Sequence, residues 1–452
     1  MNTWTPDLSS LADPVAPADQ GALVSLAPYM GVFFVAFFVA IVATFVMRKL
    51  AIANGIVDWP DLKRKNHALP VAYLGGIGIF IGWVAGVFVS YLLTPDFAPD
   101  SIAIYGIQSF PLSIFIGAGV ITLTGLFDDV NGLSPRTKVG GQLFAAAALT
   151  WNQIGINLTE QLFGLVGLAP SPTVVYFAAT MLVALFVLGG CNAVNLIDGL
   201  DGLASGVVAI AMIGFLTIAV LMSDVPEVAI DNPKRFILCL ATIGAILGFL
   251  PYNFNPATIF MGDAGSLLLG FLSISAILLF GDALGWSLKL VTAALVIFAV
   301  PITDTSLAIV RRKLRGQPIL SPDNQHLHHL LRKSGLSVKK SVFVMYGAAL
   351  VFGALGVAMV ALELQWRYSL AIFTVLYGFI MVLAFKYGAY CLEMDRQQRE
   401  AVEPAIAEGA PIDQPAEVAG HSNGDTNGDS AVVDAPEASL GNGDRLGTGS
   451  RP

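Results

Sequence analysis

Apolar segments about as long as a lipid bilayer is thick recur along the chain, separated by short polar connections. A transmembrane helix needs about 20 apolar residues, because backbone polar groups inside a bilayer must be satisfied within the protein. The segments that meet or approach this length lie at residues 27–50, 71–93, 107–127, 138–154, 173–194, 203–222, 235–253, 263–280, 287–310, 341–362 and 367–391. The pattern predicts an all-α, polytopic integral membrane protein with about eleven transmembrane helices.

The charges that flank these segments predict the orientation of the chain. Arg48 and Lys49 follow the first apolar run, whereas a cleavable signal peptide carries its charge before that run. We therefore expect a retained first span with the N-terminus outside. In that orientation fifteen Lys and Arg residues lie in inside connections and four in outside ones, which agrees with the positive-inside rule. The C-terminus is then cytoplasmic.

The two ends of the chain differ in composition from the apolar region between them. Residues 1–26 contain no Lys or Arg and are predicted to form an extracytoplasmic segment. Residues 393–452 are rich in Glu, Asp, Gly, Asn and Pro, so we expect a disordered acidic cytoplasmic tail. The transmembrane domain is expected to span residues 27–392.

The overall composition excludes a soluble globular protein. The 452-residue chain is 55% hydrophobic and 12% charged, whereas about a quarter of the residues of a soluble domain are charged. Its mean hydropathy is +0.72. The three cysteines form no Cys-x-x-Cys pair, so neither a disulfide framework nor a cysteine zinc site is indicated. We expect the lipid bilayer as the environment of the chain and no nucleic-acid partner.

A polar stripe interrupts the end of the fifth apolar segment. In the stretch GGCNAVNLIDGLDGLASG (189–206), every third position is polar, at Asn192, Asn195, Asp198 and Asp201. At helical spacing these side chains would share one face of a membrane helix. A carboxylate at membrane depth costs about 2.5–3.5 kcal/mol on insertion scales. Two of them therefore indicate a bound cation, a polar cavity or both.

Further acidic residues are predicted at the same, inner membrane face. Asp128 and Asp129 end the third segment and Asp263 begins the eighth, while Asp304 lies within the ninth. Helix capping would explain the first pair taken alone, but three acidic clusters at one face favour a cation site. Oxygen ligands without cysteine favour Mg²⁺, the usual cation where phosphates complete the coordination shell.

Basic residues are predicted beside these acids, mainly in the connection 311–340. Its candidate ligands are Arg311, Arg312, His326, His328 and His329. Positive-inside topology accounts for most of its Lys and Arg. The histidines could bind zinc but lack further soft ligands, and next to arginines they favour a diphosphate-binding role. Residues 63–67, Arg136 and Lys138 add cationic groups. Such a site fits phosphoryl transfer, and burial against lipid indicates a lipid substrate.

Five ordered motifs within residues 54–340 resemble those of the polyprenyl-phosphate N-acetylhexosamine-1-phosphate transferase family. They are GIVDWPDLKRKNHALPVAYLGG, GLFDDVNGLSPRTKVGGQ, NAVNLIDGLDGLASG, NPATIFMGDAGSLLLG and the HLHH loop. The resemblance implies transfer of a sugar 1-phosphate from a UDP-HexNAc to undecaprenyl phosphate, with release of UMP. It implies Mg²⁺ as cofactor, with Mn²⁺ as the alternative. It also implies an inner-membrane enzyme with a cytoplasm-facing site that initiates cell-surface polysaccharide synthesis, and it leaves a homodimer open.

The resemblance assigns catalytic roles to four carboxylates. Asp263 matches the direct Mg²⁺ ligand, and Asp198 matches a residue near the metal and the diphosphate. Asp128 and Asp129 match the acidic pair near the lipid phosphate, one of which is proposed in the family as a base. A phosphate monoester is already mostly ionised at neutral pH, with a second pKa of about 6. We therefore expect an orienting or metal-linked role for this pair.

The resemblance also assigns substrate contacts. Asn195 matches a polar residue near the diphosphate, Asp201 matches the residue that hydrogen-bonds uracil, and Phe260 matches the ring that stacks on the base. The remaining substrate contacts are expected at Lys138, Arg311, Arg312, His326, His328 and His329.

Three alternatives compete with this interpretation. The stretch HLHHLLRKSG (326–335) is similar to the WecA/TagO-like branch, which favours UDP-N-acetylglucosamine over the UDP-muramoyl-pentapeptide of the MraY type. A CDP-alcohol phosphotransferase would need an Ala-Arg pair after its first Asp-Gly, where residues 203–205 are Leu-Ala-Ser. An ion-coupled transporter would also bury acids, but internal repeats and midplane charges are typical of that class, and neither is seen in the sequence.

Overall fold

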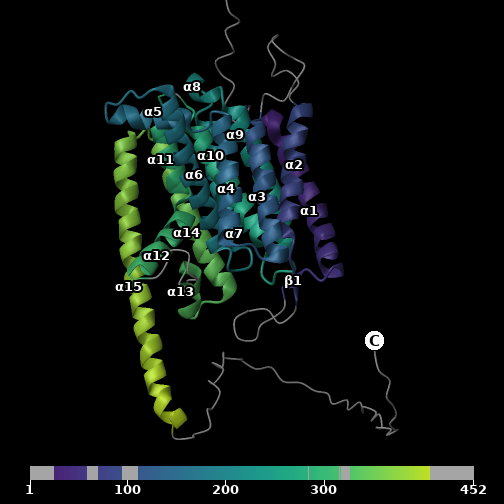
Figure 1. Cartoon of the computed structure of the whole chain (residues 1–452), viewed down its shortest axis with the longest axis vertical. Coiled ribbons are helices and arrows are strands. Elements are labelled where there is room, and N and C mark those ends of the chain that lie inside the picture. The colour runs from purple at the N-terminus through teal and green to yellow at the C-terminus, as the bar shows by residue number, and fades with distance from the viewer. Residues whose placement is uncertain are drawn as a thin grey trace, which may run out of the picture. The chain divides into compact units, whose positions relative to one another are not determined.

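The computed structural model describes residues 25–58, 70–93, 110–283, 285–314, 316 and 326–407. Its helices are α1 (Met30–Ala53), α2 (Gly75–Leu93), α3 (Leu112–Asn131), α4 (Pro135–Trp151), α5 (Ile156–Leu165), α6 (Pro172–Ile197), α7 (Leu203–Leu221), α8 (Pro226–Ala229), α9 (Asn232–Asn253), α10 (Gly262–Phe280), α11 (Ser287–Ile297), α12 (Ala299–Leu314), α13 (Leu327–Lys333), α14 (Val338–Ala361) and α15 (Trp366–Ala407). A short 3-10 turn, η2 (Ala27–Tyr29), precedes α1, and two short strands, β1 (Val57–Asp58) and β2 (Val71–Ala72), form an antiparallel pair. The prediction of an all-α membrane protein is confirmed (Figure 1).

Nine helices in the described part of the chain are long and apolar enough to cross a membrane. They match nine of the eleven predicted segments. The predicted segment 287–310 is instead a pair of helices, α11 and α12, bent by 73° at their junction. Pro301 explains the bend, because it has no N–H to donate to the carbonyl four residues earlier, at Ile297. The predicted segment 138–154 is α4, whose 17 residues span only about 25 Å.

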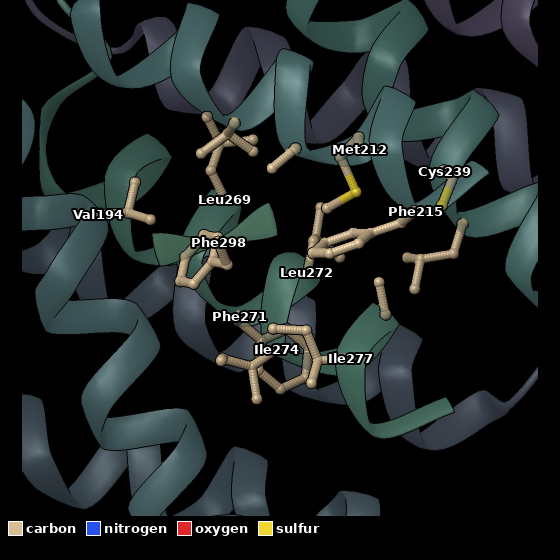
Figure 2. Close-up of a cluster of buried hydrophobic side chains, with 14 of the residues drawn as sticks. Val194, Met212, Phe215, Cys239, Leu269, Phe271, Leu272, Ile274, Ile277 and Phe298 are labelled. Carbon is tan, nitrogen blue, oxygen red and sulfur yellow. The ribbon is translucent and has the colours of Figure 1, made fainter. Parts of the chain in front are cut away.

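Helix α10 forms the centre of the bundle and packs against α2, α3, α6, α7 and α9. In the 18-residue apolar stretch of α10, 94% of the residues are buried, whereas in that of α15 the share is 6%. A helix that is apolar all round is buried on every side, and the sequence of α10 has this character. Figure 2 shows part of the resulting core, in which Leu269, Phe271, Leu272, Ile274 and Ile277 of α10 lie among side chains of neighbouring helices.

Small residues bring the backbones of α2 and α3 close to the beginning of α10. A side chain at Gly125 of α3 would collide with the backbone of Ala264, and one at Gly76 of α2 would collide with Gly265. Close approach through small residues is a common mode of helix packing in membranes. It places the C-terminal end of α3, with Asp128 and Asp129, beside the N-terminal end of α10.

The strand pair holds the segment that precedes α10. Phe260 N–H donates to the Ala72 carbonyl at 2.8 Å, and the Phe260 carbonyl accepts from Gly75 N–H at 3.0 Å. Gly76 N–H then donates to the Met261 carbonyl at 2.9 Å. Strand β2 and the beginning of α2 therefore fix the backbone that carries Phe260 and leads into Asp263.

The ends of the chain lie mostly outside the described residues. Of the predicted N-terminal segment 1–26, only the last two residues are described. The predicted tail was expected to begin at residue 393, but α15 continues as a helix to Ala407. Residues 408–452 are outside the described part of the chain, so the prediction of a disordered tail stays a prediction for them. The inside and outside assignment of the two termini also stays a prediction.

Candidate active site

The N-terminal end of α10 is capped by a carboxylate from another helix. Asp129 Oδ1 accepts from Asp263 N–H at 2.8 Å, and Asp129 Oδ2 accepts from Ala264 N–H at 3.0 Å. The first N–H groups of a helix have no acceptor within the helix, and a carboxylate stabilises them further through the helix dipole. Both oxygens of Asp129 are thus engaged by the α10 backbone. This contact ties α3 to α10 and orients the backbone of Asp263.

Asp263 lies at the centre of a polar cluster formed by the four helices α3, α4, α6 and α10. Lys138 Nζ of α4 is 2.6 Å from Asp263 Oδ2 and 2.6 Å from Asp128 Oδ2. Asn195 Nδ2 of α6 donates to Asp263 Oδ1 at 2.9 Å and to Ser266 Oγ at 2.9 Å. Asp128 Oδ1 accepts from Leu133 N–H at 2.7 Å. The two carboxylates of Asp128 and Asp263 therefore converge on one positive charge.

A cavity of about 380 Å³ opens beside this cluster. Of the predicted residues, the lining includes Asn195, Asp198, Asp201, Phe260, Asp263 and His329. The size is within the range of small-molecule sites, and the convergent polar groups are typical of them. Lys138, Asp128 and Asp129 do not line the cavity themselves. They are connected to it through the ion pairs of Lys138 with Asp128 and Asp263 and through the contact of Asp129 with the α10 backbone.

The polar stripe is only partly helical, which corrects the sequence prediction. Helix α6 ends at Ile197, so Asp198 and Asp201 lie in the turn before α7 rather than on a helix face. Gly202, the residue before α7, has a φ of +78°, a backbone conformation that glycine adopts without strain. The chain therefore does not continue as one helix from α6 into α7. Asn192 donates to Gln142 Oε1 at 3.2 Å and is not among the cavity-lining residues.

The carboxylate of Asp198 lies in a strongly acidic environment. Burial raises the pKa of Asp198 to about 8, and the nearby carboxylates of Asp263, Asp129 and Asp201 act in the same direction. Burial and the surrounding carboxylates likewise raise the pKa of Tyr73, whose hydroxyl therefore stays protonated. A cation bound among these groups would reverse the shift at Asp198 by stabilising its ionised form.

Asp201 connects the turn after α6 to the loop before α10. Asp201 Oδ2 accepts from Asn255 Nδ2 at 2.8 Å and from Ala257 N–H at 3.0 Å. Asn253 strengthens the same connection, because its Oδ1 accepts from Gly202 N–H at 3.1 Å. Its Nδ2 donates to the carbonyl of Ile259, also at 3.1 Å. The loop that carries Phe260 is therefore held by hydrogen bonds to the turn that carries Asp201.

The predicted basic groups divide into three sets. His329 lines the cavity, and the rings of His326 and His328 lie behind it, with the His328 and His329 centroids 4.2 Å apart. Arg311 and Arg312 lie in the last turn of α12, are largely buried and do not line the cavity. Residues 63–67 fall outside the described residues.

The sequence prediction missed four polar residues that line the cavity: Asp58, Tyr73, Asn253 and Asn255. The two asparagines had a usable signal, since Asn-Phe-Asn-Pro at the end of an apolar span is unusually polar. Asp58 and Tyr73 gave no sequence signal beyond their place in the first motif. They come to the cavity through the pairing of β1 with β2, which the sequence pattern does not indicate. The Tyr73 and Phe260 rings meet edge to face, with centroids 5.9 Å apart.

The oxygen donors at the cavity fit a hard cation. As they stand, the described residues contain no group of three or more His, Cys, Asp or Glu side chains arranged to hold a metal ion. The ammonium group of Lys138 nevertheless lies where the Asp128 and Asp263 oxygens converge, which shows that this point attracts positive charge. Carboxylate and amide oxygens are the ligands that Mg²⁺ takes in proteins, usually together with substrate phosphates.

Comparison with known proteins identifies the class to which this arrangement belongs. Residues 111–281 match the glycosyl transferase family 4. A probable undecaprenyl-phosphate N-acetylglucosaminyl 1-phosphate transferase of Bacillus subtilis is 36% identical over 354 residues, which are 78% of this chain and 90% of the relative. A decaprenyl-phosphate N-acetylglucosaminephosphotransferase of Mycolicibacterium smegmatis is 33% identical, covering 74% of this chain and 82% of the relative. An undecaprenyl-phosphate alpha-N-acetylglucosaminyl 1-phosphate transferase of Yersinia pestis is 28% identical, covering 79% and 92%.

The helical membrane fold and these relatives define the class, a polytopic membrane enzyme of the phosphoglycosyl transferase type. Within that class, the chain belongs to the polyprenyl-phosphate N-acetylhexosamine-1-phosphate transferase family, in its WecA/TagO-like branch. The expected family is confirmed. Neither the muramoyl-pentapeptide transferase nor the ion-coupled transporter is favoured by these relatives.

Proposed function

We propose that the chain transfers N-acetylglucosamine 1-phosphate from UDP-N-acetylglucosamine to a polyprenyl phosphate, undecaprenyl phosphate being the expected acceptor, and releases UMP. The observation that carries the proposal is the position of Asp263, at the junction of the acidic cluster and a cavity of about 380 Å³. The names of the relatives support the same donor sugar and lipid class.

In the proposed reaction, an oxygen of the lipid phosphate attacks the sugar-bearing phosphorus of the UDP-sugar. A new phosphorus–oxygen bond forms there, and the bond between that phosphorus and the bridging oxygen breaks, so that UMP leaves with the bridging oxygen. No proton has to be removed when the lipid phosphate is already ionised. We assign Asp129 the task of orienting α10, because both its oxygens accept hydrogen bonds from that backbone.

We propose that Asp263, supported by Asn195 and Asp198, holds Mg²⁺. When bound, the ion screens the negative charges of the two phosphate groups. Lys138 carries a positive charge between Asp128 and Asp263, and we infer that it also contacts phosphate oxygens once substrate is present. Mn²⁺ is the alternative ion, since it prefers the same oxygen ligands.

We assign the far part of the cavity to the nucleoside. Phe260 offers an aromatic face for the base, and Asp201 has an oxygen, Oδ1, beyond the one that binds Asn255 and Ala257. His329 is the described histidine that lines the cavity, and we assign it to the diphosphate. The distribution of Lys and Arg supports a cytoplasmic position of this site in the inner membrane. The proposed role in initiating cell-surface polysaccharide synthesis follows from the product, and a homodimer stays a prediction.

The test is an assay of the detergent-solubilised, full-length protein with undecaprenyl phosphate, Mg²⁺ and a panel of UDP-sugars. We expect UMP release with UDP-N-acetylglucosamine, loss of that release on chelation with EDTA, and recovery on addition of Mg²⁺. UMP release with UDP-muramoyl-pentapeptide alone would instead assign the chain the activity of the MraY type. If no UDP-HexNAc yields UMP, the proposed function is wrong.

A further inference from the structure

A buried carboxylate on the bent pair of helices holds the short helix that carries the histidines. Asp304 of α12 is 0% exposed, and both of its oxygens contact the beginning of α13. Asp304 Oδ2 is 2.8 Å from His326 Nδ1, and Asp304 Oδ1 accepts from Leu327 N–H at 2.7 Å. Because an ionised carboxylate only accepts hydrogen bonds, His326 Nδ1 is the donor in this contact.

Helix α13 depends on such a contact because it is short. It has seven residues, and isolated helices of this length are marginal in water. Its N-cap residue is His326, whose side chain makes no capping hydrogen bond. Asp304 supplies the acceptor instead, from a different helix, to the first N–H of α13.

The anchored helix forms part of the cavity wall. His328 is 1% exposed, and a side chain added at Gly199 would collide with its ring. Neither ring nitrogen of His328 has a hydrogen-bond partner among the described residues, so the ring acts as a packing surface against the turn that contains Gly199. The next residue, His329, lines the cavity. The place of His329 therefore depends on where α13 begins.

We propose that Asp304 is a positioning residue, which holds His326 and Leu327 so that His328 packs against Gly199 and His329 faces the cavity. The proposal rests on the proposed function, in which His329 contacts the diphosphate of the UDP-sugar. Asp304 itself is fully buried, does not line the cavity and touches no reacting atom in this arrangement. Its contribution is the fixed geometry of a contact made by another residue.

The test compares Asp304→Ala with Asp304→Asn in the full-length protein. Asp304→Ala removes both acceptors, so we expect the KM for UDP-N-acetylglucosamine to rise about tenfold or more, as loss of a hydrogen bond to a charged group predicts. The KM for undecaprenyl phosphate should stay within about twofold, since α13 does not contact the Asp128–Asp129 end of α3 in the proposed scheme. Amide hydrogen exchange of residues 326–333 should accelerate by about tenfold.

Asp304→Asn keeps one oxygen for Leu327 N–H and should retain slow exchange in residues 326–333. Should Asp304→Ala fail to fold, His326→Ala tests the same anchor, with a raised KM for the UDP-sugar and partly retained protection. The matched control is Asp282→Asn, which neutralises a carboxylate just beyond the opposite end of α10 and should change neither KM nor exchange in α13.

Two results would overturn the proposal. One is an Asp304→Ala protein with unchanged KM and unchanged exchange in residues 326–333. The other is loss of turnover with that segment still protected, which would indicate a direct role in the chemistry. If the wild-type protein releases no UMP from any UDP-HexNAc, the proposed function fails, but hydrogen exchange still decides whether Asp304 anchors α13.

Discussion

At the residue scale, the charge of Asp263 is the feature on which the proposed chemistry depends. One carboxylate oxygen of Asp263 forms an ion pair with Lys138 at 2.6 Å, and the other accepts a hydrogen bond from Asn195 at 2.9 Å. An uncharged amide of the same shape would preserve the packing but would no longer bind the proposed Mg²⁺. We expect Asp263→Asn to lower UMP release by about 100-fold or more. The thermal unfolding midpoint in detergent should stay close to wild type.

The control for Asp263→Asn is Asp231→Asn. Asp231 precedes the first residue of α9, forms an ion pair with Lys234 at 2.7 Å and does not line the cavity. Its loss should leave the rate unchanged. A near-normal rate for Asp263→Asn at ordinary Mg²⁺ concentration would contradict the assignment of Asp263 as metal ligand.

Asp129 should respond differently, because it caps α10. Replacing it by alanine removes the acceptors of two N–H groups, and loss of an N-cap typically costs about 1 kcal/mol. We expect Asp129→Ala to lower the unfolding midpoint as well as the rate, and Asp129→Asn to lower the midpoint less. Circular dichroism melting in detergent measures the first effect. A full loss of rate at an unchanged midpoint would instead support a direct chemical role.

Several polar residues of the candidate cavity could be predicted at this scale, because polar and ionisable residues are rare in apolar segments. Asn195, Asp198, Asp201 and Asp263 were conspicuous for that reason, and all four line the cavity. Their local conformation was harder to predict, since the three-residue spacing continues past the end of α6. Tyr73 could not be found, because its position depends on backbone pairing with a segment almost two hundred residues later.

At the scale of elements, the contact between α3 and α10 determines how the acids meet. Gly125 of α3 faces the backbone of Ala264, whereas a side chain at Gly119 of the same helix would meet only a Phe80 ring atom at 4.0 Å. We expect Gly125→Ala to lower the unfolding free energy by about 1–3 kcal/mol through overpacking. It should also reduce UMP release, because Asp128 and Asp129 move relative to Asp263.

Gly119→Ala is the matched control for that substitution. Both changes improve helix propensity by about 1 kcal/mol, so the difference between them isolates the packing effect. Gly119→Ala should melt at or above the wild-type temperature with an unchanged rate. Equal behaviour of the two variants would show that close approach of α3 to α10 is not required.

The bent pair of helices α11 and α12 shows where prediction of elements from the sequence failed. Residues 287–310 are mostly apolar, with Lys289 and Asp304 as their charged residues, so hydropathy alone indicates one straight span. Pro301 was an available signal, but a proline in a membrane helix is tolerated whenever neighbours satisfy the freed carbonyl. Helix α12 packs against α6 and α14, and the periodicity of the sequence does not encode such contacts. The bend matters because α12 carries Asp304.

At the scale of the whole molecule, the C-terminal end should be dispensable. Residues 408–452 have few large apolar side chains, and nothing in their composition supports a packed core. We expect deletion of 408–452 to leave UMP release within about twofold of wild type. The cut is placed after Ala407, because α15 continues to that residue. A large loss of activity in a well-folded truncated protein would assign the tail a function.

The orientation that we expect from the charge distribution can be tested at two loops. Asp224 lies in the short connection between α7 and α8, and Ser334 lies between α13 and α14; both are exposed. The cavity is lined by His329, close in sequence to Ser334, and Figure 1 shows α8 and α13 at opposite ends of the bundle. The positive-inside rule predicts that the α13 end lies in the cytoplasm.

We therefore expect a membrane-impermeant thiol reagent to label Asp224→Cys in intact cells and Ser334→Cys only after permeabilisation. Cys191 and Cys239 are buried and should not react, and replacing Cys391 removes the remaining native thiol. Helix α4 is short and the α11–α12 pair is bent, so each of them could cross the membrane or not. A count of spans therefore does not fix the side of the membrane on which the cavity lies. Labelling does not depend on that count. Ser334→Cys labelled in intact cells would place the cavity outside, where UDP-sugars are not made, and would contradict both the topology and the proposed donor.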